Sequence, residues 1–348
     1  MKPIVAALLA AGIFAGAAAA QSAAAEDVSA AFKPDAVDEA AARREGALTW
    51  YTSTPVAAAQ FIAGEFEHRY GIKVELLRTG GQNVIRRFLQ EIDSGRIAVD
   101  AITMSDMSAA HAMTRRGLFV PFRPLGFDKT IADAKDPKGS YIAQRLTLVG
   151  LLTRTDKVAP ADLPKTWTDL LDAKFKGMLV MADPSFTAIQ LVVVATLSRN
   201  LGWQFYEGLR KNDVMIVQGH EQIFDMIKRG ERFVAAESSD PRIYTGGVMP
   251  PNMVNVIPAK GAIQVPSPTA IVNGSPHPNA AKLFAQFNLD PEIQHKFTEE
   301  GHHSARIDVP PPPGLPTLDQ LSLYQIDYDW IESNTRQIKA KFAEIFLR

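Results

Sequence analysis

The chain has 348 residues, a formal net charge of −1 and no cysteine. The lack of cysteine excludes disulfides, thiolate metal sites, a cysteine nucleophile and a lipid anchor on an N-terminal cysteine. The near-neutral charge argues against nucleic acid as a partner.

Residues 1–25 are predicted to form a cleaved secretory signal. Lys2 precedes an apolar stretch rich in alanine, and small residues at 18–20 and 23–25 offer two cleavage points. An uncleaved membrane anchor is the alternative, but alanine and glycine partition weakly into lipid. We therefore expect an exported protein that is free in the periplasm.

The chain that follows predicts an α/β fold. A charge-rich helix is expected over 27–45, and then strands at 48–51, 73–77 and 99–105 alternate with helices at 57–70, 84–94 and 108–116. This order is typical of a parallel sheet covered on both faces.

A second α/β segment is predicted between about 150 and 265. An apolar run over 145–158 precedes a helix over 163–177 with Thr166 as its N-cap, a strand at 178–181 and a helix at 187–199. A further strand, helix and strand follow. The last predicted elements are a strand at 269–272, two helices, a polyproline segment and a helix from 328.

Three turns between a predicted strand and a predicted helix are rich in small polar residues. They read "TSTP" (52–55), "TGGQN" (79–83) and "DPSFT" (183–187). Ser and Thr at such positions usually cap the helix. The alternative is that the helix N-termini are held open for a ligand, because they offer free N–H groups and a partial positive charge.

Motifs spread over nearly the whole mature chain carry a resemblance to a known family. They are "LTWYTST", "RTGGQNVIRRFLQEIDSGRIAVDAITMSD", "GLFVPF", "KTWTDLLDAKFKGMLVMADPS" and "IPAKGAIQVPSPTAIVNGSPHPNAAKLFAQFNLDPEIQ". In this order and spacing the chain resembles bacterial extracellular solute-binding protein family 1, the group that includes ferric-iron-binding proteins.

The resemblance implies a type II periplasmic-binding-protein fold, with two α/β lobes and a ligand cleft between them. Lobe 1 would comprise 46–148 plus 268–348, and lobe 2 would comprise 149–267. It also implies a monomer that closes about a hinge near 148–153 and 265–270. Its partners would be a small-molecule solute and an inner-membrane ABC permease.

Most of the predicted ligand-binding residues come from the polar turns and from the segment that corresponds to the iron site of the family, and Asp106 follows the strand predicted at 99–105. The predicted residues are Ser53, Thr54, Gly81, Asp106, Ser185, Thr187, Ser238 and Tyr244. Many hydroxyls and helix N-termini favour a small anionic organic solute, such as a phosphonate, a sugar phosphate or a carboxylate. Arg78 and Arg242 are candidate counter-charges.

Ferric iron is the runner-up ligand, and a polyamine or thiamine-like cation comes third. The iron binders of the family use two adjacent tyrosines, where this chain has Ser238 and Ser239 with a lone Tyr244 after them. We therefore predict no metal and no cofactor. His295, His302 and His303 are expected to be solvated surface residues.

An extracytoplasmic hydrolase is the function of a different class that stays open. The motifs G-x-S-x-G, G-x-x-x-x-G-K-[ST], G-x-G-x-x-G and H-E-x-x-H do not occur in the sequence. We therefore expect a binding protein and not an enzyme.

Overall fold

The structure is a computed structural model that describes residues 32–347. The predicted signal segment 1–25 and the first part of the helix predicted over 27–45 lie outside the described residues. From Pro34 onward the chain packs into one unit. Within the described part of the chain, no helix is long and apolar enough to cross a membrane.

Seven strands form the first sheet, in the order β11-β4-β10-β3-β1-β2, with β12 beside β10. β1 runs parallel to β2 and β3, whereas β10 is antiparallel to β3 and β4. The parallel part confirms the strands predicted in the first hundred residues. The strands are β1 (Ala47–Thr52), β2 (Lys73–Arg78), β3 (Ala101–Thr103), β4 (Ile142–Val149), β10 (Lys260–Ile271), β11 (His303–Ser304) and β12 (Ser322–Leu323).

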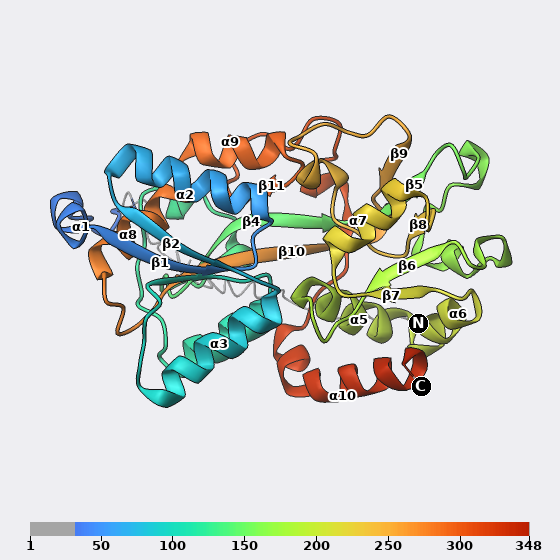
Figure 1. Cartoon of the computed structure of the whole chain (residues 1–348), viewed down its shortest axis with the longest axis horizontal. Helices are drawn as coiled ribbons and strands as arrows, with labels where there is room; N and C mark the ends of the chain where they lie inside the picture. The colour runs from blue at the N-terminus through green and yellow to red at the C-terminus, as the bar shows by residue number, and fades with distance from the viewer. Residues whose placement is uncertain (1–31, 348) are drawn as a thin grey trace, which may run out of the picture. The chain divides into compact units, whose positions relative to one another are not determined.

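Helices cover both faces of the first sheet. Neighbouring residues of β1 point to opposite faces, and each face carries a buried aromatic residue, so each face needs a covering layer. Trp50 packs with Phe66 and Phe284, whereas Tyr51 belongs to a second cluster with Phe88. In Figure 1, α2 and α3 accordingly lie on opposite sides of β1 and β2. The helices are α1 (Glu39–Glu45), α2 (Val56–Tyr70), α3 (Gly81–Ser94), α4 (Met107–Arg115), α8 (Pro278–Phe287) and α9 (Pro291–Glu299).

The second sheet has the order β7-β6-β8-β5-β9. Its strands are β5 (Leu151–Arg154), β6 (Leu179–Ala182), β7 (Met215–Val217), β8 (Val234–Ala235) and β9 (Met253–Val256), and its helices are α5 (Ala188–Leu201), α6 (Trp203–Lys211) and α7 (His220–Arg229). The C-terminal helix α10 (Tyr328–Phe346) shares a core with this sheet, where Phe342 and Phe346 pack against Tyr206.

The chain passes from the first sheet to the second at Gly150, which lies between β4 and β5. Gly150 pairs with Ser238, and a Cβ atom at this position would collide with the side chain of Asn255. β4 lies beside β10 in the middle of the molecule (Figure 1), with Thr147 opposite Val265 and Arg145 opposite Ser267. The two long central strands therefore carry side chains from the first sheet toward the second. The division into lobes at 148/149 and 267/268 stays a prediction.

Three predicted elements differ from the structure. Within the described part of the helix expected over 27–45, only Glu39–Glu45 is helical, and Asp38 caps its first turn. The helix expected over 163–177 is wrong: this segment holds the short 3₁₀ turns 167–171 and 173–175, after another at 160–162. Thr166 does cap the first of the two, but the buried Trp167 and Leu170 are spaced by three, which suits a 3₁₀ turn, and Asp172 then starts a new turn. The strand expected at 269–272 is the end of the longer β10, whose two prolines conceal it in the sequence.

Candidate ligand-binding site

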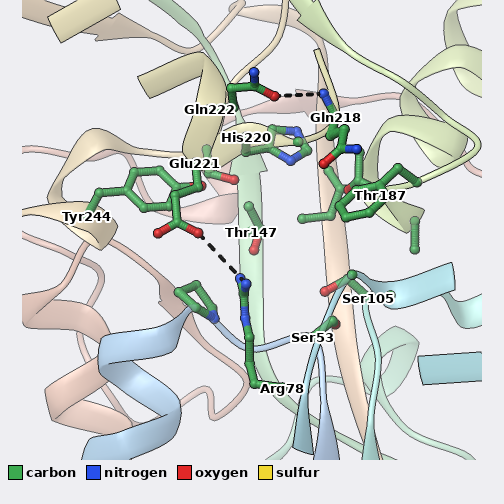
Figure 2. Close-up of a pocket in the computed structure, with 18 of the residues that line it drawn as sticks. Ser53, Arg78, Ser105, Thr147, Thr187, Gln218, His220, Glu221, Gln222 and Tyr244 are labelled. Atoms are coloured by element: carbon green, nitrogen blue, oxygen red, sulfur yellow. Dashed lines mark hydrogen bonds and ion pairs between the residues drawn. The ribbon is translucent and has the colours of Figure 1, made fainter. Parts of the chain in front are cut away.

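A cavity of about 340 Å³ lies where the two sheets face each other. Its walls come from the ends of β1, β2 and β3, from the middle of β4, and from the first turns of helices of both sheets. Figure 2 shows Ser53 and Ser105 on one side, Thr187 and Gln218 on another, Tyr244 opposite them and Thr147 in the centre. Most of the labelled side chains are polar, so the lining is suited to a polar ligand.

Four helices begin at this cavity. The residues that precede their first turns all line it: Pro55 before α2, Gly80 before α3, Thr187 before α5 and Gly219 before α7. None of these four helices receives a capping hydrogen bond from a side chain of the described residues. Their free N–H groups and partial positive charges therefore converge on one space, which favours an anion there.

Side-chain caps are found on α1, α4, α9 and α10, whereas α6 and α8, whose preceding residues do not line the cavity, have none from the residue before them. Asp106 caps α4, with its Oδ1 accepting from the N–H of Ala109 at 3.0 Å, and Asp290 and Asp327 cap α9 and α10. Pro55, Gly80 and Gly219 lack a side chain that could accept a hydrogen bond, whereas Thr187 has a hydroxyl that caps no N–H of α5 among the described residues.

Arg145 places a buried positive charge on the cavity. It lies on β4, is only 2% exposed and lines the cavity. Its Nη1 donates to neutral acceptors, the hydroxyl of Thr54 at 3.0 Å and Oε1 of Gln144 at 2.8 Å. Among residues 32–347, Arg145 forms no ion pair with a carboxylate, and its Nε has no acceptor. Burial lowers the pKa of Arg145 to about 9, and the charge of Arg78 adds to this shift, so the guanidinium is still positive at neutral pH.

Arg78 supplies a second positive charge. It is the last residue of β2, and its Nε donates to the backbone oxygen of Thr54 at 3.0 Å. Its Nη1 lies 3.8 Å from the carboxylate of Glu221 in the first turn of α7, the contact drawn as a dashed line in Figure 2. Arg78 is therefore partly neutralised by a nearby carboxylate, whereas Arg145 makes no such ion pair with the described residues and is influenced by Glu300 only beyond contact distance. Arg242, the other predicted counter-charge, does not line the cavity, because Asp240 binds it at 2.9 Å.

A buried acid stabilises the wall near α7. His220, which lines the cavity, lies with its Nε2 2.5 Å from Oε2 of Glu237, and the other oxygen of Glu237 accepts from the N–H of Ala182 at 2.9 Å. Both side chains are buried. Glu237 is thus occupied by the protein itself, and it holds the imidazole of His220 in one orientation.

Tyr244 lines the cavity from the other side and stacks on Phe224, with 5.2 Å between the ring centroids. Burial raises the pKa of Tyr244 well above its usual value, and the nearby charges of Glu221 and Glu237 add to the effect. The phenol is therefore neutral at physiological pH, and its hydroxyl is a hydrogen-bond donor and acceptor.

Four of the eight predicted residues lie on the cavity: Ser53, Gly81, Thr187 and Tyr244. Their part in binding a ligand stays a prediction. The other four, Thr54, Asp106, Ser185 and Ser238, do not line it.

The contacts or exposure of the four residues that do not line the cavity explain where they lie. The hydroxyl of Thr54 bonds Thr52 and Gln144 inside the first sheet, and Asp106 is used as a helix cap. Ser185 is exposed, and its N–H donates to Asp183 at 2.7 Å. Ser238 is buried with its hydroxyl donating to the backbone oxygen of Ser239 at 2.8 Å.

Three residues that line the cavity beside β4 were not predicted from the sequence: Arg145, Thr147 and His302. The first two could have been found, because Arg145 and Thr147 alternate with apolar residues in "RLTLV" and so share one face of a strand. The prediction that His302 and His303 are solvated is wrong, since both are buried, whereas His295 is exposed as expected. His302 follows the end of α9, whose packing carries it inward beside β4.

No cluster of three or more His, Asp, Glu or Cys side chains that could hold a metal ion occurs in the part of the chain that the structure describes. Tyr244 is the single tyrosine on the cavity. The arrangement offers hydroxyls, N–H groups and a guanidinium, which are donors to an anion.

Residues 100–334, more than half of the chain, match the family model of bacterial extracellular solute-binding proteins. Protein y4fP of Sinorhizobium fredii, named as a periplasmic-binding protein of an ABC transporter, is 26% identical over 232 residues, which are 62% of each chain. A Salmonella typhimurium protein named for 2-aminoethylphosphonate binding is 24% identical over 266 residues, 73% of each chain.

Two solved structures share the fold. The periplasmic binding protein AfuA of Actinobacillus pleuropneumoniae, with exogenous fructose-6-phosphate bound, superimposes with a TM-score of 0.76 at 20% identity, over 87% of this chain and 99% of that one. Iron-bound HitA of Pseudomonas aeruginosa gives a TM-score of 0.73 at 19% identity, over 85% and 99%. The fold is therefore the type II periplasmic-binding-protein fold that the sequence predicted.

Proposed function

This chain belongs to the bacterial extracellular solute-binding protein family, and we propose that it captures a small organic anion in the periplasm for an ABC importer. The solute is a phosphonate, a sugar phosphate or a carboxylate, and it is released unchanged. The cleaved signal 1–25, the monomeric state and delivery to an inner-membrane ABC permease are parts of the same proposal.

The observation that carries the anion proposal is Arg145, a buried guanidinium on the cavity whose acceptors are all neutral. A buried charge without a counter-ion costs free energy, and an anionic solute would remove that cost. The four uncapped helix N-termini point the same way. The relatives add support, because one is named for 2-aminoethylphosphonate and one structure holds fructose-6-phosphate.

The capture mechanism we propose is closure of two lobes, 46–148 plus 268–348 and 149–267, about the strands near 148–153 and 265–270. A contact across the cavity supports it, because Nη1 of Arg78 in the first lobe lies 3.8 Å from the carboxylate of Glu221 in the second. A solute that touches both walls binds the closed arrangement more tightly, and this difference in affinity drives closure.

Calorimetric titration with a panel of phosphonates, sugar phosphates and carboxylates tests the proposal. We expect at least one anion to bind, and Arg145→Met to weaken it roughly 10- to 150-fold, as expected for a hydrogen bond to a charged group. Arg87→Met is the matched control, because Arg87 is about half exposed and pairs with Glu91 away from the cavity. Binding of no anion, or equal losses in both variants, would contradict the anion site.

Ferric iron is the competing ligand, because iron-bound HitA shares the fold. An iron site needs phenolate oxygens, and burial keeps the single cavity phenol of Tyr244 neutral. We expect the protein to stay colourless after incubation with ferric citrate and desalting. A visible absorption band that vanishes in Tyr244→Phe would instead favour iron.

A further inference from the structure

Three polar side chains on the floor of the cavity have hydrogen-bonding atoms that no residue among those described satisfies. They are Nε of Arg145, the hydroxyl of Thr147, and both ring nitrogens of His302. Each of these side chains is 2% exposed, and each lines the cavity. Buried polar groups in folded proteins are almost always hydrogen-bonded, so an unsatisfied set facing a cavity points to a partner outside the chain.

Strand pairing brings the three together. Arg145 and Thr147 are two residues apart on β4 and therefore share one face. β11 pairs antiparallel with β4, His303 opposite Leu146 and Ser304 opposite Arg145, and one further step of that register sets His302 opposite Thr147. Figure 2 shows Thr147 in the centre of the cavity. We call Arg145, Thr147 and His302 the polar floor.

The polar floor offers acceptors as well as donors. Burial lowers the pKa of His302 well below its usual value, and the charge of Arg145 adds to this, so the imidazole is neutral. A neutral imidazole has one N–H donor and one bare nitrogen acceptor, and the hydroxyl of Thr147 also does both. An ionised phosphate group only accepts hydrogen bonds, so it would leave the acceptors of the floor unsatisfied.

The group that fits is a hydroxyl. It donates to the bare nitrogen of His302 or to Thr147 and accepts from an N–H of His302 or Arg145. An ammonium group donates only, and it would sit beside the positive Arg145. We propose that the solute is a hydroxylated organic phosphate or phosphonate. Its anionic group would bind Arg145, and a neighbouring hydroxyl of the solute would form hydrogen bonds with His302 and Thr147. This inference rests on the proposed function, since it assumes an anion at Arg145.

The test compares three phosphate monoesters of similar size: glycerol 3-phosphate, propyl phosphate and 3-aminopropyl phosphate. At pH 8 a phosphate monoester is a dianion, because its second pKa is about 6, so the phosphate itself has no proton to donate. Calorimetry should show glycerol 3-phosphate binding more tightly than either analogue, by roughly 2- to 13-fold for each hydrogen bond gained.

Two variants assign that preference to the floor. His302→Leu and Thr147→Val remove unsatisfied polar atoms from a buried position, so we expect both variants to fold. In each, the ratio of the dissociation constants of propyl phosphate and glycerol 3-phosphate should fall toward 1. His302→Gln, which keeps a donor and an acceptor, should restore part of the preference. His68→Leu is the matched control, because the His68 side chain is 84% exposed on α2 and should leave the ratio unchanged.

The outcomes separate the inference from the proposed function. Binding of all three esters with equal affinity, or tightest binding of the amino ester, would overturn the proposal that the polar floor binds a hydroxyl. It would not contradict the anion site. Binding of none of the three while another anion of the panel binds would also overturn the proposal for the polar floor. A preference that survives in His302→Leu and in Thr147→Val assigns the hydroxyl to another wall. If no anion binds at all, both proposals are wrong.

Discussion

Thr187 and Ser185 lie two residues apart in one turn, and the structure places them in different surroundings. Thr187 precedes α5 and lines the cavity, yet its hydroxyl caps no N–H of α5 among the described residues. Ser185 is exposed and does not line the cavity. A hydroxyl that faces the cavity and makes no cap is available to a ligand, whereas an exposed one is already solvated.

We therefore predict that Thr187→Val weakens the bound anion by about 2- to 13-fold, the value of one neutral hydrogen bond. Ser185→Ala, the control from the same turn, should change affinity less than about twofold. Calorimetric titration of both variants measures this. Equal losses in the two variants would mean that the turn acts through its conformation and not through the Thr187 hydroxyl.

Some residues of the candidate site could be predicted from the sequence and others could not. Polar turns between strands and helices correctly indicated the edge of the sheets where the cavity lies. Three residues chosen from these turns, Ser53, Gly81 and Thr187, line it. The same rule also selected Thr54, although in two adjacent hydroxyl residues only the fold decides which one faces inward. Arg145 was missed because it begins the run 145–158, which the sequence marks only as apolar, and buried apolar segments rarely hold a charged residue.

At the scale of elements, the N-terminus of α3 and the turn before α5 meet across the cavity. A Cβ atom on Gly80 would lie 2.9 Å from the ring of Phe186 and 3.2 Å from its backbone oxygen. The backbone of Gly80 has a φ of −59°, which alanine adopts freely. The glycine is therefore required by this close approach and not by its own conformation.

Gly80→Ala should consequently hinder closure without harming the fold. We expect weaker solute binding, and in solution scattering a smaller decrease in the radius of gyration on saturation than in the wild type. Gly64→Ala is the control, since a Cβ there meets nothing within 4 Å and alanine favours the helix by up to about 1 kcal/mol. A wild-type profile that does not change with solute would argue against hinge closure altogether.

Long helices and strands with a regular spacing of apolar residues were predictable from the sequence, whereas short 3₁₀ turns were not. The spacing of apolar residues located α2 and α3 to within three residues, and strand-length apolar runs located β1 and β2. The segment 163–177 was predicted as one helix because its apolar spacing resembles a helix of 3.6 residues per turn over a short window. The three-residue spacing of Trp167 and Leu170 is resolved only when the packing of both side chains is known.

At the scale of the whole molecule, buried histidines link stability to pH. Burial lowers the pKa of His302, with Arg145 and His303 adding to the shift, and burial also lowers the pKa of His303. In the unfolded chain a histidine has a pKa of about 6.5. As the pH falls below 6.5, the unfolded state therefore takes up protons that the folded state does not, and the free energy of unfolding decreases.

Glu300 acts in the opposite direction. Burial raises the pKa of its carboxyl, so the folded state takes up this proton before the unfolded state does. As the pH falls through this raised pKa toward the ordinary carboxyl value of about 4.3, the fold therefore gains stability relative to the unfolded chain. A comparison of His302→Leu with the wild type separates the histidine contribution from that of Glu300, because both proteins contain Glu300.

We predict that the free energy of unfolding, measured by urea denaturation, falls between pH 7.5 and 5.5, with about 1.4 kcal/mol of the loss due to His302. In His302→Leu the loss over the same interval should be smaller by about that amount, because the leucine takes up no proton in either state. His68→Leu, which replaces an exposed histidine, should keep the wild-type slope. A slope that is unchanged in His302→Leu would mean that His302 is protonated within the fold, and the neutral imidazole on which the polar floor depends would be lost with it.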